Sequence, residues 1–264
     1  MLQFRHASRA SQGRRKYQED AAAIWQCDAN SGPPSENGGV AFAAVLADGM
    51  GGHAGGALAS ETVCAGFVEA FRACESAVGE RLKVALLAAN AAIARAVAGN
   101  PRLRGMGATL VGVAFGAQGA EWVSVGDSPL YLVRRGEIAR LNEDHSLTPM
   151  LDQLVADGRL SPDQAKVDPR RHYLRSAVSG EELDLIDVSR RPLMLESGDV
   201  VIVASDGIHT LGDEAIARLV ASHASDGADA TAAALIDAVD RAGDTMQDNT
   251  TVVVIAVEDG PTIL

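Results

Sequence analysis

Short apolar runs that stop at turn residues constrain the fold of this chain more than any other feature. Val40–Ala47 is continuously apolar and ends at Asp48-Gly49, and Val200–Ala204 ends at Ser205-Asp206-Gly207. Both runs are too short for a core helix, and a run of this length bounded by turn residues is typical of a buried strand. We therefore predict two buried strands, each with a carboxylate where the strand ends.

Helical spacing of apolar residues alternates with further strand patterns along the rest of the chain. Two amphipathic helices are expected after residue 57, the second ending at Gly99-Asn100-Pro101. Two further helical patterns cover Asp213–Val220 and Ala230–Arg241, and a last strand covers Thr250–Val257. Between the helix pairs, Gly-containing turns separate four short segments that predict a meander of antiparallel strands: Thr109–Phe115, Glu121–Val125, Leu130–Val133 and Ile138–Leu141. Strand meanders interrupted by helix pairs indicate an α+β layered fold.

A polar, Arg-containing segment separates this meander from the later elements. In it, Ser161-Pro162-Asp163-Gln164 has an N-cap, a proline at the first helical position and a Gln three residues after the cap, which favours a helix start. We expect a flap of short helices at about residues 145–190. Its basic residues either carry binding specificity for an acidic partner or merely offset nearby acidic side chains: Arg159, Lys166, Arg170, Arg171 and Arg175. No long linker or repeat divides the chain, so the prediction is a single domain over residues 1–264 with this flap as a subregion.

Composition excludes several classes of protein. The chain has 264 residues, and 23 basic against 35 acidic residues leave a net charge of −12, which argues against binding nucleic acid through its phosphates. Three cysteines without C-x-x-C spacing suggest neither a disulfide framework nor a zinc site, which fits a reducing compartment. No signal peptide and no run of about 18 apolar residues is evident, so we expect a cytoplasmic protein without a membrane partner.

Four aspartates share one local context although they lie far apart in the sequence. Asp48, Asp127 and Asp206 follow predicted strands, and Asp248 precedes one. Each alone is compatible with an ordinary turn, because Asp bonds its own backbone in turns. If the four strand ends converge, the carboxylates need a cation to stay ionised, and oxygen ligands favour Mg²⁺, Mn²⁺ or Ca²⁺. The pattern predicts a hard-metal site on that condition.

The glycine-rich stretch after Asp48 permits a rival interpretation. Gly49-x-Gly51-x-x-Ala54 matches a degenerate dinucleotide fingerprint, but the next strand is expected only after two helices, whereas the fingerprint belongs to a short βαβ unit. The better use of the glycines is to let a backbone carbonyl beside Asp48 approach a metal, because glycine lacks a Cβ. His53 is either a general acid or an exposed loop histidine. The remaining histidines show no ligand spacing, and most of them are expected to be surface or capping residues: His6, His145, His172, His209 and His223.

Taken in order, these segments resemble a known family. Its motifs are Arg15-x-x-x-Glu19-Asp20, Asp48-Gly49-Met50-Gly51-Gly52-His53, Gly107-Ala108-Thr109, Gly126-Asp127-Ser128, Ser205-Asp206-Gly207 and Asp248-Asn249. The chain resembles the bacterial metal-dependent protein phosphatases of the protein phosphatase 2C family, from about residue 14 to residue 257. The resemblance departs at Pro129, where the family commonly has Arg, and at His53, whose position does not match the acid proposed in eukaryotic relatives.

The resemblance implies a four-layer αββα sandwich with two central antiparallel sheets and two metal ions, Mn²⁺ or Mg²⁺, at one end. Asp48 would bridge both ions, Asp206 and Asp248 would complete the ligands of the first, and the Gly49 carbonyl would serve the second. The remaining implied roles are water-mediated metal contacts for Glu19 and Asp20, a third, weaker ion held by Asp127 with Asp206, and a phosphate contact for Arg15.

The activity implied is hydrolysis of phosphoserine and phosphothreonine by a water activated at the binuclear centre. The alternative is a catalytically silent regulator that binds phosphoproteins with the same fold. The expected partners are phosphorylated proteins, including a cognate Ser/Thr kinase and its substrates, and we expect a monomer. The physiological substrate, the choice between Mn²⁺ and Mg²⁺, the occupancy of the third site and the role of His53 are not predicted by the sequence.

Overall fold

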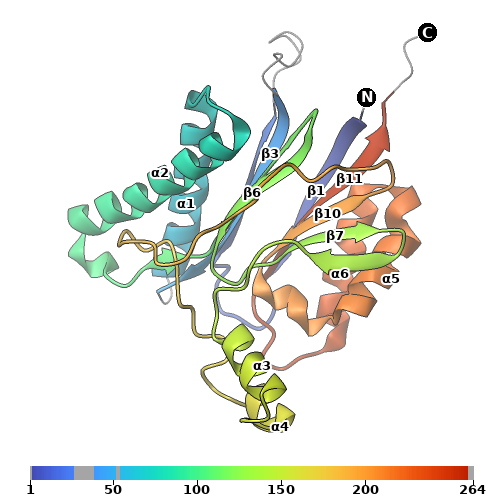
Figure 1. Ribbon diagram of the computed structural model, residues 1–264. Helices are drawn as coiled ribbons and strands as arrows, with labels where there is room; N and C mark the ends of the chain where they lie inside the picture. Colours follow the sequence, from blue (N-terminus) through green and yellow to red (C-terminus); the bar gives the residue numbers. More distant parts are fainter. Residues whose placement is uncertain (1, 27–38, 52–53, 261–264) are drawn as a thin grey trace.

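Two antiparallel sheets pack face to face, and a pair of helices covers the outer face of each (Figure 1). The computed structural model of the chain describes residues 2–26, 39–51 and 54–260. In Figure 1 the layers run from α1 and α2, through the two sheets, to α5 and α6. This arrangement confirms the predicted α+β sandwich of four layers.

The first sheet has the strand order β1-β11-β10-β7-β8. Its outer face is covered by α5 (Asp213–His223) and α6 (Ala228–Ala242), with η3 (Ala224–Asp226) between them. The strands of this sheet are β1 (Leu2–Ser11), β7 (Leu130–Arg134), β8 (Glu137–Arg140), β10 (Val200–Ala204) and β11 (Thr250–Asp259). β10 and β11 are buried along most of their length, as their continuous apolar runs predict.

The second sheet has the order β2-β3-β5-β6-β9, and β4 pairs with the end of β3. Its outer face is covered by α1 (Ala54–Ala73) and α2 (Val78–Gly99), and η1 (Pro101–Leu103) follows α2. The strands are β2 (Asp20–Gln26), β3 (Val40–Met50), β4 (Gly107–Ala108), β5 (Leu110–Gly116), β6 (Gly119–Val125) and β9 (Asp187–Val188). β3 runs on through Asp48 and Gly49, so the expected loop there is still strand.

Three apolar layers hold the sandwich together. Phe67 and Leu86 belong to the layer between α1, α2 and the second sheet. Phe42 and Val253 belong to the layer between the sheets, and Leu235 to the layer beneath α5 and α6. Burial of these aliphatic and aromatic side chains supplies the main driving force for the fold. The result is a rigid frame whose strand ends are fixed in space.

The predicted meander is wrong in one respect. β5 and β6 lie in one sheet and β7 and β8 in the other, because the chain crosses between the sheets at Gly126-Asp127-Ser128-Pro129. Gly126 has a φ of 104°, and a Cβ there would lie 2.6 Å from the Thr109 side chain. Only glycine fits both the left-handed backbone and the close approach. Local patterns predicted the strands but not their division between sheets.

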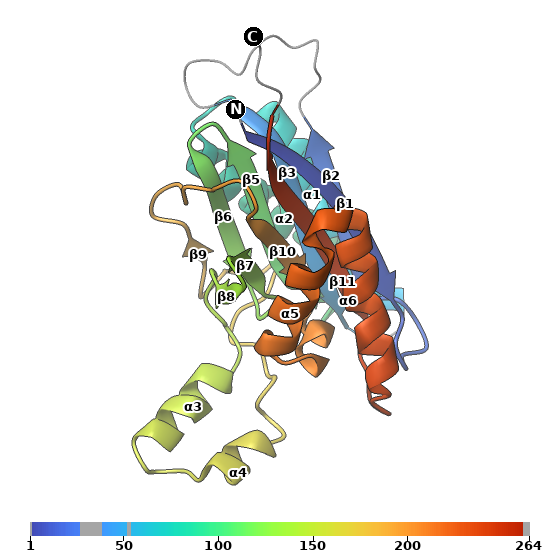
Figure 2. The same ribbon diagram turned by 90° about the vertical axis from the view of Figure 1, so that its right-hand side faces the viewer.

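The flap lies beyond one end of the sandwich. It carries α3 (Thr148–Ala156) and α4 (Pro162–Lys166), which project away from the sheets in both views (Figures 1 and 2). Ser161 and Gln164 form the predicted capping box, in which each side chain bonds the other residue's backbone N–H. A helical flap is therefore present at the predicted place.

One helix passes a length and composition test for a membrane span although charged residues interrupt its apolar sequence. By length and composition, α2 could cross a membrane, with a mean hydropathy of 1.5 over its most apolar window. The same test is passed by core helices of proteins that never enter a bilayer. In this structure, Leu82, Leu86 and Ile93 of α2 pack into the layer shared with α1 and the second sheet.

Candidate metal and phosphate site

The four strand-end aspartates converge on one cleft of about 550 Å³. Asp48 lies near the end of β3, Asp127 follows β6, Asp206 follows β10 and Asp248 precedes β11. The described part of the chain adds further predicted residues to the same cleft lining: Arg15, Glu19 and Gly49. The condition set for a hard-metal site, convergence of the strand ends, is thus met. β10 and β11 are antiparallel neighbours, and β3 and β6 lie on either side of β5 and end at the same edge of the other sheet.

Strand register places Asp20 beside this group. Asp20 and Asp48 are direct partners across β2 and β3. The Ser205 hydroxyl donates to Asp20 Oδ2 at 2.7 Å and accepts from the Thr251 N–H at 2.9 Å. Asp20 is therefore anchored to the turn that carries Asp206.

The Gly107-Ala108-Thr109 segment holds the backbone of Asp48. The Thr109 N–H donates to the Asp48 carbonyl at 2.9 Å, and the Asp48 N–H donates to Thr109 Oγ1 at 3.0 Å. Thr109 Oγ1 also lies 2.7 Å from Ser128 Oγ. Asp48 and the Asp127 turn are thus linked through one buried threonine.

Gly49 and Gly56 are needed for close packing around Glu19. The Gly49 N–H donates to the Glu19 carbonyl at 3.0 Å. A Cβ on Gly49 would overlap the carbonyl oxygens of Gly56 and Glu19, and one on Gly56 would overlap Glu19 Oε1. Sequence reasoning assigned Gly49 to a carbonyl contact and missed Gly56, which provides the space for the Glu19 carboxylate.

Asn249 fixes the loop that carries Arg15 and Glu19. Its Oδ1 accepts from the Glu19 N–H at 2.8 Å, and its Nδ2 donates to the carbonyls of Gln12 and Tyr17 at 2.9 and 3.0 Å. The Asp248-Asn249 motif therefore combines a carboxylate facing the cleft with an amide that positions the neighbouring loop.

Arg15 points into the cleft, whereas Arg14 does not. Arg15 Nη2 forms an ion pair with Asp248 Oδ2. Arg14 lines a separate cavity beside α6, and its N–H donates to the Gln247 carbonyl at 2.8 Å. Of the two arginines, only Arg15 is placed to meet a group bound among the aspartates.

Among the residues that the structure describes, too few basic side chains lie near these carboxylates to offset their negative charge. Burial raises the pKa of Asp127 to about 7, helped by the charges of Asp206 and Asp144, and raises the pKa of Asp20 to about 6. Burial and acidic neighbours also raise the pKa values of Asp48 and Asp206. Buried oxygens without hydrogen-bond partners remain on Glu19, Asp20 and Asp206. Clustered carboxylates with unused buried oxygens fit a hard divalent cation.

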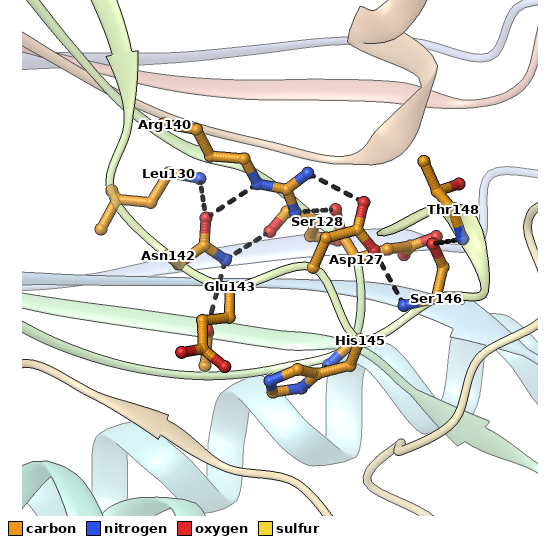
Figure 3. A network of polar contacts seen from close by, with 12 residues as sticks. Asp127, Ser128, Leu130, Arg140, Asn142, Glu143, His145, Ser146 and Thr148 are labelled. Carbon is orange, nitrogen blue, oxygen red and sulfur yellow. Dashed lines mark hydrogen bonds and ion pairs between the residues drawn. The ribbon is translucent and has the colours of Figure 1, made fainter. Parts of the chain in front are cut away.

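A hydrogen-bond network positions Asp127 (Figure 3). Arg140 Nη2 donates to the Asp127 carbonyl at 2.7 Å and Nη1 pairs with Asp144 Oδ2 at 3.1 Å. Asn142 Nδ2 donates to the Ser128 carbonyl at 2.9 Å. The guanidinium beside this turn comes from Arg140 and not from position 129, where proline stands.

One predicted surface histidine belongs to the site. Single ligand atoms of Asp127, His172 and Asp206 all lie within 4.8 Å of one another. His172 also lines the cleft, although the sequence offered no ligand spacing for it. Its partners come from two distant strand ends, so only the tertiary structure could bring the three together. His53, the other histidine considered, lies outside the described residues.

The chain is similar to known bacterial phosphatases in sequence and in fold. The sequence profile described as Protein phosphatase 2C matches residues 27–238. The serine/threonine protein phosphatase PstP of Mycobacterium tuberculosis is 36% identical over 175 residues, which are 65% of this chain and 32% of PstP. Protein phosphatase PhpP of Streptococcus pneumoniae is 32% identical over 168 residues, or 62% of this chain and 66% of PhpP. The chain thus spans about a third of PstP and about two thirds of PhpP.

Solved structures match over nearly the whole chain. The crystal structure of the mycobacterial phosphatase PstP superposes with a TM-score of 0.77 and 31% identity, covering 97% of this chain and 99% of that chain. A structure of the PstP catalytic domain in complex with two manganese ions has a TM-score of 0.75 and 31% identity, covering 98% of this chain and 100% of that chain.

Proposed function

The chain belongs to the protein phosphatase 2C family, and from that membership we propose that it is a serine/threonine protein phosphatase that depends on Mn²⁺ or Mg²⁺. The observation that carries the proposal is the cleft in which four strand-end aspartates meet without enough positive charge to offset them. An acidic cleft of this kind repels a phosphate ester unless cations occupy it. The substrate and the metal must therefore share the site.

The metal ligands we propose are those that line the cleft with carboxylate or carbonyl oxygens. Asp48, Asp206 and Asp248 would hold the principal pair of ions, with the Gly49 carbonyl, and Asp127 would serve a weaker third ion. Glu19 and Asp20 would act through water. When bound, two such cations lower the pKa of a water nucleophile and stabilise charge on the phosphoryl oxygens.

The chain's own residues orient the substrate around those ions. Arg15 faces the cleft and offers the planar fork that binds two phosphate oxygens. Before substrate binds, it pairs with Asp248. Occupation of Asp248 by a cation would release the guanidinium toward the phosphate. Asn249 would hold the backbone of the Arg15 loop in place while the guanidinium changes partner, because its side chain donates to the carbonyls of Gln12 and Tyr17.

Substrate choice is proposed to lie in the flap, at about residues 145–190. Arg170 pairs with Asp168 at 2.8 Å and Arg171 with Asp152 at 3.0 Å, so these two charges are offset locally. In the described part of the chain, no ion pair involves Arg159, Lys166 or Arg175, and all three are exposed. These three, rather than Arg170 and Arg171, are placed to meet an acidic phosphopeptide.

We infer a single catalytic domain over residues 1–264, a monomer, a cytoplasmic location, and phosphorylated proteins as partners, including a Ser/Thr kinase and its substrates. Magnesium is proposed as an alternative to manganese. The reducing character suggested by the cysteines and the net charge of −12 support a cytoplasmic protein that does not bind nucleic acid.

The experiment that tests the function measures hydrolysis of p-nitrophenyl phosphate and of a phosphothreonine peptide. Both activities should require Mn²⁺ or Mg²⁺ and disappear in EDTA. Full activity of the metal-stripped protein would contradict the mechanism. If the protein binds the phosphopeptide and metal without turnover, the catalytically silent alternative would be supported instead.

A further inference from the structure

We propose that His172 is a direct metal ligand, that with Asp127 and Asp206 it forms a cation site selective for Mn²⁺ over Mg²⁺, and that filling this site fastens the flap to the sandwich. The inference deepens the proposed function and rests on it for the presence of the metal centre. It adds a nitrogen ligand, a metal preference and a link to the flap.

The geometry of the three side chains carries the first step. Single ligand atoms of Asp127, His172 and Asp206 lie within 4.8 Å of one another. Asp127 is only 8% exposed, and Asp206 Oδ1 is buried without a hydrogen-bond partner. Two largely buried carboxylates therefore meet an exposed imidazole at the edge of the cleft, and one carboxylate oxygen has no other use among the described residues.

The donor set argues for the metal preference. Mg²⁺ prefers oxygen ligands and keeps several waters, whereas first-row transition ions also accept imidazole nitrogen, Mn²⁺ the most weakly among them. A site with one nitrogen and two carboxylates therefore favours Mn²⁺ over Mg²⁺. The other proposed ligands of the cleft are oxygens, so they would discriminate less between the two ions.

The place of His172 in the chain argues for the link to the flap. His172 lies between two residues tied to the start of α3: the Thr148 hydroxyl donates to the Arg171 carbonyl at 3.0 Å, and the Leu147 N–H donates to the Tyr173 carbonyl at 3.0 Å. On the other side, the His145 N–H donates to the Gly126 carbonyl at 3.1 Å, beside Asp127. Both chain segments at the base of the flap thus adjoin the same site.

The network around Asp127 continues this connection to the first flap helix. Asp144, which pairs with Arg140, accepts from the Ser146 N–H at 2.8 Å, and Ser146 Oγ accepts from the Thr148 N–H at 3.1 Å (Figure 3). A cation shared by His172 and Asp127 would connect the two ends of this series of contacts, which runs from Asp127 to the start of α3 and on to the residues beside His172. The flap would then be ordered by metal as well as by hydrogen bonds.

The test compares metal binding by the wild type, His172→Ala and His172→Gln. Bound Mn²⁺ is counted by equilibrium dialysis with elemental analysis over a range of free Mn²⁺, and the series is repeated with Mg²⁺. Both variants should weaken the weakest Mn²⁺ site by at least about 10-fold, since even loss of an outer partner costs that much. Mg²⁺ binding should change little. Gln keeps the size of the side chain, so equal losses in both variants would assign the effect to the imidazole.

His209→Ala is the matched control, because His209 lines the neighbouring cavity with Asp127 and His172 but is absent from the ligand group. It should bind Mn²⁺ as the wild type does. Amide hydrogen exchange gives a second readout: Mn²⁺ should slow exchange at residues 168–175 in the wild type and not in His172→Ala. Melting temperatures of the metal-free variants should match the wild type, which excludes misfolding.

The outcomes separate this inference from the proposed function. Unchanged Mn²⁺ counts and affinities in both His172 variants would overturn the inference, even if the wild type hydrolyses p-nitrophenyl phosphate with Mn²⁺. Equal losses of Mn²⁺ and Mg²⁺ would overturn the claimed preference. If the variants lose one Mn²⁺ but the wild type has no phosphatase activity with any metal, the site stands and the proposed function fails.

Discussion

At the scale of single residues, the carboxylates of the cleft differ in what they contact. Asp20 is held by Ser205, Asp248 pairs with Arg15, and Asp206 retains a buried oxygen without a partner. Asp127 receives its fixed position from Arg140 through a backbone bond. These differences predict that substitutions will not be equivalent.

Asn in place of Asp48, Asp206 or Asp248 should remove nearly all turnover, because each change deletes a proposed ligand charge of the principal metal pair. Asp127→Asn should lower turnover while two metals stay bound, because it affects the weaker third ion. Steady-state kinetics and metal counts for the four variants test this division. If the two principal metal positions were empty in the Asp127→Asn variant, the assignment would be contradicted.

Arg15→Ala should lower kcat/KM for a phosphothreonine peptide by roughly 10- to 150-fold, the equivalent of a charge-assisted contact of about 1.5–3 kcal/mol. Arg14→Ala is the control, because Arg14 lines a separate cavity. Equal losses in the two variants would mean that general positive charge matters, and not the guanidinium that faces the cleft.

At the scale of elements, the start of α1 packs against the end of β3 through glycines. The close approach of Gly49 to the Gly56 and Glu19 carbonyls leaves no room for a side chain on Gly49. Among the described residues, a Cβ on Gly55, in the first turn of α1, would meet only the Met106 side chain, at an ordinary contact distance of 3.8 Å. Gly49 and Gly55 therefore differ in whether the structure tolerates a larger side chain at their positions.

Gly49→Ala should destabilise the metal-free protein by about 1–3 kcal/mol, because backbone must shift to admit the methyl group. Gly55→Ala should be neutral or stabilise by up to about 1 kcal/mol, because alanine favours the helix and meets no backbone atom of the described part of the chain there. Urea unfolding monitored by circular dichroism measures both. Equal stability of the two variants would contradict the packing described for β3 and α1.

The flap is the element on which substrate choice is proposed to depend. Arg159→Ala combined with Lys166→Ala should weaken turnover of a phosphoprotein while leaving p-nitrophenyl phosphate nearly unaffected, because the small substrate reaches only the cleft. Arg170→Ala is a control whose charge is already offset by Asp168. Parallel losses on both substrates would show instead that the flap supports the metal site. Unchanged turnover of both substrates would mean that these flap residues have no role in recognition.

At the scale of the whole molecule, the acidic cleft links pH, metal and stability. Asp127 and Asp20 have pKa values raised from 3.8 to about 7 and about 6, mainly by burial. A raised pKa means that the metal-free folded state binds more protons than the unfolded state between these limits. The contribution of these groups to stability is therefore present below about pH 4 and lost as the pH rises through about 6 to 7.

Bound Mn²⁺ should reverse this loss, since a ligand that binds only the folded state stabilises it and competes with protons for the carboxylates. We expect the rise in Tm caused by Mn²⁺ to be larger at pH 8 than at pH 5.5. Asp127→Asn should flatten the pH dependence of the metal-free Tm. Differential scanning calorimetry at the two pH values tests both statements, and a larger metal effect at pH 5.5 would contradict them.

Local sequence patterns predicted most of the strands, the helix pairs and the residue types of the cleft. Apolar runs, helical spacing and capping residues are local signals, and they predicted β3, β10, β11, the helix pairs and the capping box of α4. Local patterns did not predict β1 and β2, because both strands are largely half-buried or exposed and lack continuous buried runs. The ordered motifs also identified the family and the carboxylates that meet in the cleft.

Which of these residues contact one another depends on the tertiary structure. The division of the expected meander between two sheets depends on a crossing at Gly126 that strand patterns do not encode. His172 joins Asp127 and Asp206 because the base of the flap folds against two strand ends from other parts of the chain. Such contacts arise from the packing of rigid layers, and packing depends on all the strands and helices together rather than on the residues near any one of them.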